Sequence, residues 1–172
     1  MKKIITVVFM CSILIWTAKG LANGTAVYQQ DWQSPQAVIA ALYDSISAEA
    51  GEQRDWQRFR ALFFEGTRFT MALPPTETGG IVTTDVEKLI EQTEQLYKPI
   101  GFFEIETDQH IIKYNQMANI YSSFEIKKSL KDEQPLMRGL NHFQLLFDGK
   151  RWWVVSNTSI LIDDTFKLAE QF

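Results

Sequence analysis

Six polar side chains, set among apolar neighbours, are the residues of this chain best suited to contact a ligand. They are Tyr43, Tyr97, Gln109, Ser122, Asn141 and Ser156. Amide, hydroxyl and phenol groups donate and accept hydrogen bonds without carrying charge near neutral pH. Such groups can orient a small, mostly apolar molecule, whereas proton transfer needs a titratable group within hydrogen-bond reach. The six residues therefore predict a binding site, with neither a catalytic residue nor a cofactor.

Asn141 and Ser156 are predicted to face each other in the middle of an apolar surface. A buried polar pair costs free energy unless its hydrogen bonds are made. Either the pair is satisfied within the protein, or it contacts water and a ligand in a cavity. Gln109 and Ser122 pose the same alternative on a neighbouring hairpin. If the Asn141–Ser156 pair holds a ligand, Asn141→Leu should leave stability unchanged, whereas a structural pair would lose about 1 to 3 kcal/mol.

The titratable side chains are predicted to lie on solvated surfaces. His110 and His142 fall on the outer face of the sheet, and neither has a second histidine at a metal-ligand spacing, so no metal site is predicted. Glu104, Glu106 and Asp108 alternate along one strand, as is typical of its wet face.

Two β-hairpins must position the candidate residues. In the first, a two-residue turn at 115–116 would pair Gln109 with Ser122 and Ile105 with Ile126 on one face. A slip of one residue would move each of these side chains to the other face of the sheet.

The second hairpin is indicated by the turn sequence Asp148-Gly149 between two alternating runs. A two-residue turn there pairs Asn141 with Ser156 on the inner face. It places Trp153 and His142 on the outer face.

Three helices precede the hairpins, each indicated by a capping residue and an apolar stripe at helical spacing. Their predicted limits are Pro35 to Gly51, Asp55 to Gly66 and Thr84 to Pro99. A strand is expected over Thr67–Leu73, and Asp164 would begin a short last helix. The order predicts an α+β domain in which three helices pack on a strongly bent, mostly antiparallel sheet that encloses a cone-shaped cavity.

The chain resembles the nuclear transport factor 2-like superfamily, which includes SnoaL-like polyketide cyclases and steroid isomerases. Three segments carry the resemblance: residues 38–43 of the first helix, 62–65 at the end of the second, and 138–153 around the second hairpin. The similarity spans residues 35 to 162 and is greatest to secreted bacterial single-domain members without an assigned activity. It implies the fold and a periplasmic or extracellular location, but no substrate.

The steroid isomerase branch places a general-base aspartate on the strand after the second helix. The corresponding residues 69–73 contain no carboxylate, which argues against that chemistry. A SnoaL-like hydrolase or isomerase remains the first alternative, with His142 or Asp44 as the catalytic residue. The second alternative is a dimeric interaction module whose own side chains fill the cavity.

The N-terminus is typical of a secretory signal peptide, with Lys2 and Lys3 before an apolar run and small residues at Gly20 and Ala22. This gives a signal peptide at 1–22, a flexible leader at 23–33 and one domain at 34–172. Cleavage would leave 14 basic and 21 acidic residues, a net charge of −7, and would remove the only cysteine. No nucleic acid, no membrane after cleavage and no disulfide is therefore expected.

We expect the exported protein to begin at Asn23, because Gly20 and Ala22 are the small residues nearest the end of the apolar run. Intact-mass measurement on the exported chain tests this. A chain that retains Met1, or one with lipid on Cys11, would contradict it.

A homodimer is expected through the outer face of the second hairpin, because Trp153 and His142 give that face more apolar surface than a monomer usually exposes.

Overall fold

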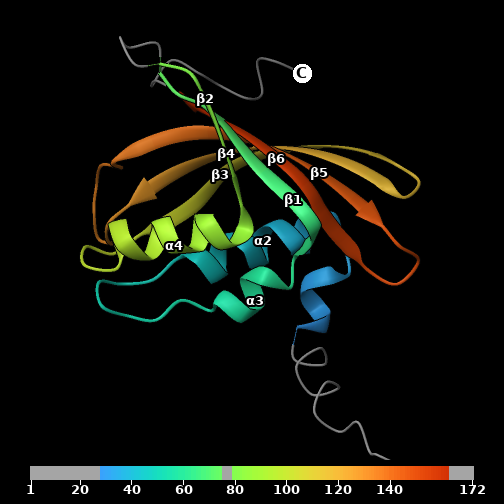
Figure 1. Cartoon of the computed structure of the whole chain (residues 1–172), viewed down its shortest axis with the longest axis horizontal. Coiled ribbons are helices and arrows are strands. Elements are labelled where there is room, and N and C mark those ends of the chain that lie inside the picture. The colour runs from blue at the N-terminus through green and yellow to red at the C-terminus, as the bar shows by residue number, and fades with distance from the viewer. Residues whose placement is uncertain (1–27, 75–78, 163–172) are drawn as a thin grey trace, which may run out of the picture.

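The computed structural model describes residues 28–74 and 79–162, which form three α-helices, one 3-10 helix and six strands (Figure 1). The elements are η1 (Gln29–Trp32), α2 (Pro35–Ile46), α3 (Trp56–Arg60), β1 (Phe63–Ala72), β2 (Ile81–Asp85), α4 (Val86–Tyr97), β3 (Phe103–Tyr114), β4 (Met117–Lys127), β5 (Met137–Phe147) and β6 (Trp152–Ile162). The predicted signal peptide, the start of the leader and the helix from Asp164 lie outside the described residues.

The six strands form one sheet in the order β2-β1-β6-β5-β4-β3, and only β1 and β6 run parallel. The sheet is strongly curled, and the described helices all lie on its concave side (Figure 1). The predicted α+β class, with three helices on a bent and mostly antiparallel sheet, is confirmed. None of the described helices is long and apolar enough to span a bilayer.

Capping side chains start the helices close to where the sequence predicts. Ser34 accepts a hydrogen bond from the backbone of Ala37 at 3.1 Å, and Asp55 accepts one from Arg58 at 2.9 Å. The third helix begins at Val86, because the side chain of Asp85 rather than Thr84 accepts from the next turn.

The helices end earlier than predicted, and strands take up the difference. Helix α2 ends at Ile46 and α3 at Arg60. Residues 63–66, expected at the end of the second helix, begin β1 instead, and Gly66 with φ +83° lies where the register of β1 against β6 shifts. The short strand β2 occupies residues that the sequence assigned to a loop and a helix cap.

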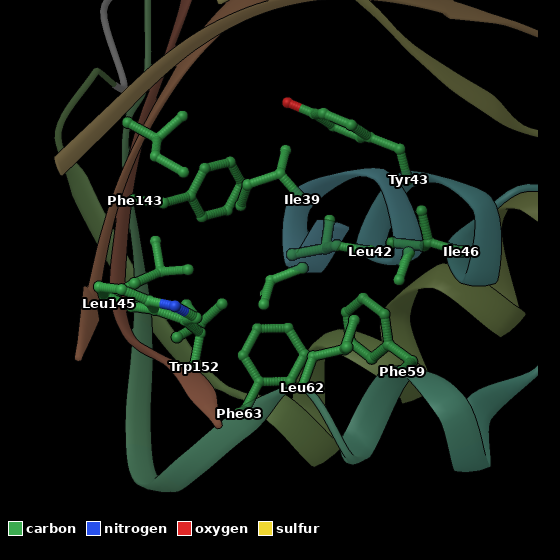
Figure 2. Close-up of a cluster of buried hydrophobic side chains, with 14 of the residues drawn as sticks. Ile39, Leu42, Tyr43, Ile46, Phe59, Leu62, Phe63, Phe143, Leu145 and Trp152 are labelled. Carbon is green, nitrogen blue, oxygen red and sulfur yellow. The ribbon is translucent and has the colours of Figure 1, made fainter. Parts of the chain in front are cut away.

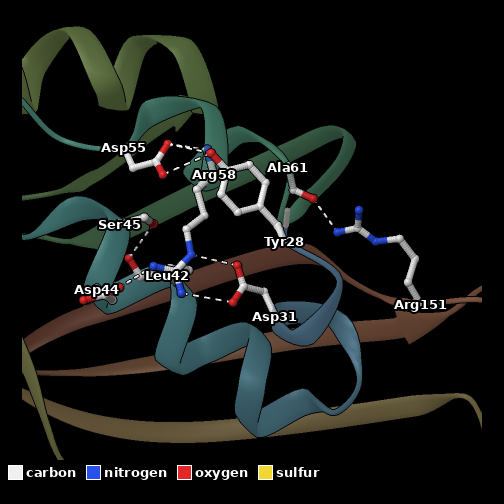
Figure 3. A network of polar contacts seen from close by, with 9 residues as sticks. All are labelled: Tyr28, Asp31, Leu42, Asp44, Ser45, Asp55, Arg58, Ala61 and Arg151. Carbon is white, nitrogen blue, oxygen red and sulfur yellow. Dashed lines mark hydrogen bonds and ion pairs between the residues drawn. The ribbon is translucent and has the colours of Figure 1, made fainter. Parts of the chain in front are cut away.

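A polar network fastens the described end of the predicted leader to the domain (Figure 3). Arg58 donates to both carboxylate oxygens of Asp31, at 2.7 and 3.0 Å, and also pairs with Asp44. Tyr28 donates to Asp55. With Trp32 of η1 buried as well, residues 28–33 pack as part of the domain.

An apolar core fills the space between α2, α3 and one half of the sheet (Figure 2). Its fully buried members include Ile39, Phe59, Phe143 and Leu145. Each such side chain contributes about 1.5 to 3 kcal/mol on burial. Tyr43 stands at the border of this core and directs its hydroxyl away from Phe59 (Figure 2).

The first hairpin has the predicted turn but carries a bulge on β3. Gln109 pairs with Ser122 as expected. The register then shifts between Glu106 and Asp108, so that Glu104 rather than Ile105 lies opposite Ile126. A bulge inserts one extra residue and reverses the faces beyond it, and the predicted Ile105–Ile126 pair is therefore wrong.

The second hairpin has a longer turn than predicted and a bulge on β6. Phe147 pairs with Trp152 across a four-residue loop, so each partner on β6 lies two positions further along the chain than predicted. Because side chains alternate with a period of two, the first residues of β6 keep the faces predicted for them. The bulge then follows at Val155, so that Ser156 faces outward. Asn141 pairs with Ser159, and the predicted Asn141–Ser156 pair is wrong.

Candidate functional site

The bulge on β3 turns two carboxylates toward the concave side of the sheet. Glu104 bonds to the inward residue Asn141 of β5, and Glu106 bonds to the inward residue Ser122 of β4. Tyr43 of α2 bonds to both Ser122 and Asn141. We call these five residues, together with Gln109 and Asn157, the Glu104 cluster.

Asn141 is the centre of the cluster. Its Nδ2 donates to Glu104 Oε1 at 3.0 Å and to Tyr43 Oη at 3.1 Å, while its Oδ1 accepts from Asn157 Nδ2 at 3.2 Å. The carboxylate can only accept when ionised, which fixes the orientation of the amide. Both hydrogens of the Asn141 amide are therefore committed to protein partners.

A second part of the cluster leads from Tyr43 to Glu106. Ser122 Oγ donates to Glu106 Oε1 at 2.5 Å, and Gln109 Nε2 donates to the same oxygen at 2.8 Å. A serine has one hydroxyl hydrogen, so Tyr43 must be the donor in its 2.8 Å bond to Ser122. The hydrogen bonds thus run in one direction, from Asn141 through Tyr43 and Ser122 to Glu106.

The fold raises the pKa of the Glu104 carboxyl towards neutral pH. Burial raises its pKa to about 7, and the hydrogen bond from Asn141 offsets only part of that effect. The Glu104 amide donates to Ser47 Oγ at 3.1 Å, which fixes the backbone beneath the carboxyl. A carboxyl that titrates near neutral pH can accept and return a proton under physiological conditions.

The Glu104 carboxyl has hydrogen-bond acceptor capacity left for a further partner. Within the described residues, Asn141 is the only side chain bonded to it, through Oε1. Glu104 and Gln109 are partly exposed, whereas Tyr43, Ser122 and Asn141 are buried. The cluster therefore extends from the interior of the fold to a side that solvent reaches.

The structure brings four of the six predicted site residues directly together: Tyr43, Gln109, Ser122 and Asn141. Tyr97 of α4 lies alongside, its ring 4.6 Å from that of Phe102. Burial and the nearby charge of Glu104 both raise the pKa of Tyr97. That a ligand contacts these residues stays a prediction.

Ser156 does not belong to the cluster. Its hydroxyl donates to Gln144 Oε1 at 2.8 Å on the outer face, because the bulge at Val155 reverses the alternation of β6. Asn157 takes the inward place that the sequence gave to Ser156.

Glu104 and Glu106 are the functional candidates that sequence reasoning missed, since regular alternation assigned them to the wet face. The alternation of residue types along β3 gives no signal of the bulge, which sets the two glutamates opposite Ile126 and Phe124.

The catalytic residues of the alternative hypothesis lie elsewhere. His142 stacks on Tyr121 on the outer face and bonds to Asn119 at 3.2 Å. Asp44 is exposed and pairs with Arg58. In the part of the chain that the structure describes, no three His, Cys, Asp or Glu side chains are grouped to hold a metal ion.

No protein-family model matches the sequence, and no curated protein is detectably similar to it. Solved structures do match the fold. An NTF2-like protein with a cystatin-like fold from Novosphingobium aromaticivorans has a TM-score of 0.57 at 13% identity, over 91% of this chain and 96% of its own. A protein of unknown function from Nostoc punctiforme, also with a cystatin-like fold, has a TM-score of 0.56 at 13% identity, over 77% and 91%.

A third match is a candidate dehydratase of the NTF2-like family from Streptomyces avermitilis, with a TM-score of 0.52 at 9% identity, over 80% of this chain and 97% of its own. At these identities the comparisons establish the fold alone. The chain has the nuclear transport factor 2-like fold, as the sequence resemblance implies.

Proposed function

We propose that this protein, which has the nuclear transport factor 2-like fold, binds a small and mostly apolar molecule at the Glu104 cluster and exchanges a proton with it through Glu104. The observation that carries the proposal is a carboxyl with a pKa of about 7, held by Asn141 on one oxygen. The predicted export signal supports action in the periplasm or outside the cell.

The surroundings of Glu104 fit a weakly polar ligand. Ile126 lies opposite Glu104 in the register, and the rings of Tyr97 and Phe102 pack together nearby. Apolar walls with a few convergent polar groups are typical of small-molecule sites. Packed side chains fill the space between α2, α3 and the sheet, so we expect the ligand at the Glu104 cluster.

A neutral carbon acid is the substrate class that such a base fits best. A carboxylate in an apolar setting can remove a proton next to a carbonyl group, a step that begins isomerisations and eliminations. A dehydratase is named among the fold neighbours. The sequence interpretation favoured binding over catalysis because it found no inward carboxylate, and Glu104 removes that objection.

The expected activity is hydrogen–deuterium exchange at carbon. In D2O at about pD 8, where Glu104 is ionised, we expect the protein to exchange the α-protons of cyclohexanone or decalone at least about tenfold faster than buffer. Proton NMR follows the loss of the signal. Glu104→Gln keeps the side-chain shape and the acceptor for Asn141 but should abolish the exchange.

Glu91→Gln is the matched control, since Glu91 lies exposed on α4 and bonds only to Lys88 and Gln95 among the described side chains. This variant should exchange at the wild-type rate. Exchange that survives in folded Glu104→Gln, or that matches buffer for both ketones in the wild type, would count against the proposal.

A further inference from the structure

A row of inward-facing residues leads from the Glu104 cluster across the sheet to its edge at β2. Asn141 of β5 pairs with Ser159 of β6. Ser159 pairs with Met71 of β1, and Met71 pairs with Val82 of β2. Residues that pair across strands share a face of the sheet, so these four side chains all lie on its concave side. The row passes from an amide through a hydroxyl to purely apolar side chains.

Two leucines broaden the apolar end of this row. Leu161 lies two residues after Ser159 on β6, and Leu73 lies two residues after Met71, so both face the same side. We call Met71, Leu73, Val82 and Leu161 the aliphatic strip. The strip contains neither an aromatic ring nor a charge.

The strip is exposed although it lies on the concave side of the sheet. Val82 is 49% and Leu73 37% exposed, and Met71 and Leu161 are partly exposed. None of the four packs on the buried core of the described residues. The end of the β1–β2 hairpin extends past the helices (Figure 1). An exposed apolar patch beside a polar site is typical of a surface that binds a ligand.

The row has the length of a hydrocarbon chain. Asn141 and Val82 are three strand spacings apart in the sheet, which corresponds to about 14 Å. An extended chain of about ten to twelve carbons spans that distance. Aliphatic side chains, one of them a flexible methionine, can pack along such a chain without requiring a ring of a particular shape.

We propose that the aliphatic strip binds the hydrocarbon chain of a long-chain carbonyl compound whose carbonyl end lies at the Glu104 cluster, and this substrate class rests on the function proposed for Glu104. The change of polarity along the row fixes the direction of the molecule. The hydrogen-bonding groups lie at the Asn141 end, whereas the strip offers neither a donor nor a strong acceptor. The carbon next to the carbonyl group then carries the proton that Glu104 exchanges.

Methyl ketones of increasing length test the strip, from 2-butanone through 2-hexanone, 2-octanone and 2-decanone to 2-dodecanone, titrated into the exported protein. The dissociation constant should fall about twofold for each added methylene, because a chain that lies on a surface buries about half of each group. Methyl NMR signals report the position of the chain. The signal of Met71 should begin to shift at a shorter chain length than that of Val82.

A substitution at the far end of the strip should shorten the chain that the protein can hold. Val82→Asp should bind 2-dodecanone no more tightly than 2-octanone, because a charge there disfavours contact with the last methylenes. Ile81→Asp is the matched control, since Ile81 is the neighbouring residue on β2, is 75% exposed and faces the opposite side of the sheet. This variant should bind every ketone as the wild type does.

The outcomes separate the strip from the chemistry of Glu104. An affinity that does not change with chain length in the wild type overturns the strip, even if the protons of 2-butanone are exchanged. Chain-length dependence without any proton exchange supports the strip and contradicts the activity proposed for Glu104. Equal loss of 2-dodecanone binding in the two variants would place the chain elsewhere. Methyl shifts that follow the protein concentration rather than the ketone would assign the strip to a second copy of this chain, and either result overturns the proposal.

Discussion

Raising the pH from about 5 to about 8 should lower the free energy of unfolding by about 2.5 kcal/mol through Glu104 alone. The pKa of this carboxyl rises from 4.5 to about 7 on folding, mainly because burial disfavours the charged form. Between these two values the folded state binds more protons than the unfolded state. The contribution is thus fully present below about pH 4.5 and is lost as the pH rises through about 7.

Urea unfolding at a series of pH values measures this dependence, and Glu104→Gln isolates it. The glutamine cannot ionise, so the variant should lose the decline between about pH 5 and 8 that Glu104 causes. Equal slopes in the two proteins would show that Glu104 has an ordinary pKa in the folded state. That result would also remove the basis of the proposed proton exchange.

Replacing Asn141 with Leu should destabilise the protein strongly, by about 3 kcal/mol or more. The variant loses hydrogen bonds to Glu104, Tyr43 and Asn157, the last two in a buried setting. Each buried polar group left without a partner costs about 1 to 3 kcal/mol. For a domain of this size the melting temperature should fall by roughly 10 °C.

Gln95→Leu is the control for this prediction, since Gln95 is an exposed amide on α4 that bonds to Glu91. Its melting temperature should change by no more than a degree or two. Had Asn141 faced only Ser156 and a ligand, Asn141→Leu would be neutral. A melting temperature that stays within the control's range would mean that the three hydrogen bonds add little.

The sequence predicts the elements of this fold better than the faces of its strands. Capping residues such as Ser34 and Asp55 act within one helical turn, so their effect is visible locally. The turn at 115–116 is equally local, and near it Gln109 and Ser122 pair as predicted. Inward placement of Tyr43, which follows from helical spacing, is confirmed as well.

The candidate site was only half predictable, because two bulges decide which side chains point inward. A bulge depends on how a strand fits its partner and on the curl of the whole sheet, and it leaves the alternation of residue types unchanged. One reverses Glu104 and Glu106, and the other reverses Ser156 and Asn157. Each error in the predicted site comes from a residue beyond one of these bulges.

The place of β6 in the sheet sets an order for folding. β6 is the last strand described along the chain, yet it lies in the middle of the sheet, between β1 and β5. The hairpin of β1 and β2 and the meander from β3 to β5 can form earlier, but only β6 joins them. Assembly must therefore wait for contacts between residues about 90 positions apart, such as Phe63 with Val154. Such distant pairings slow folding, so the edges of β1 and β5 stay unpaired until the last described strand has been made.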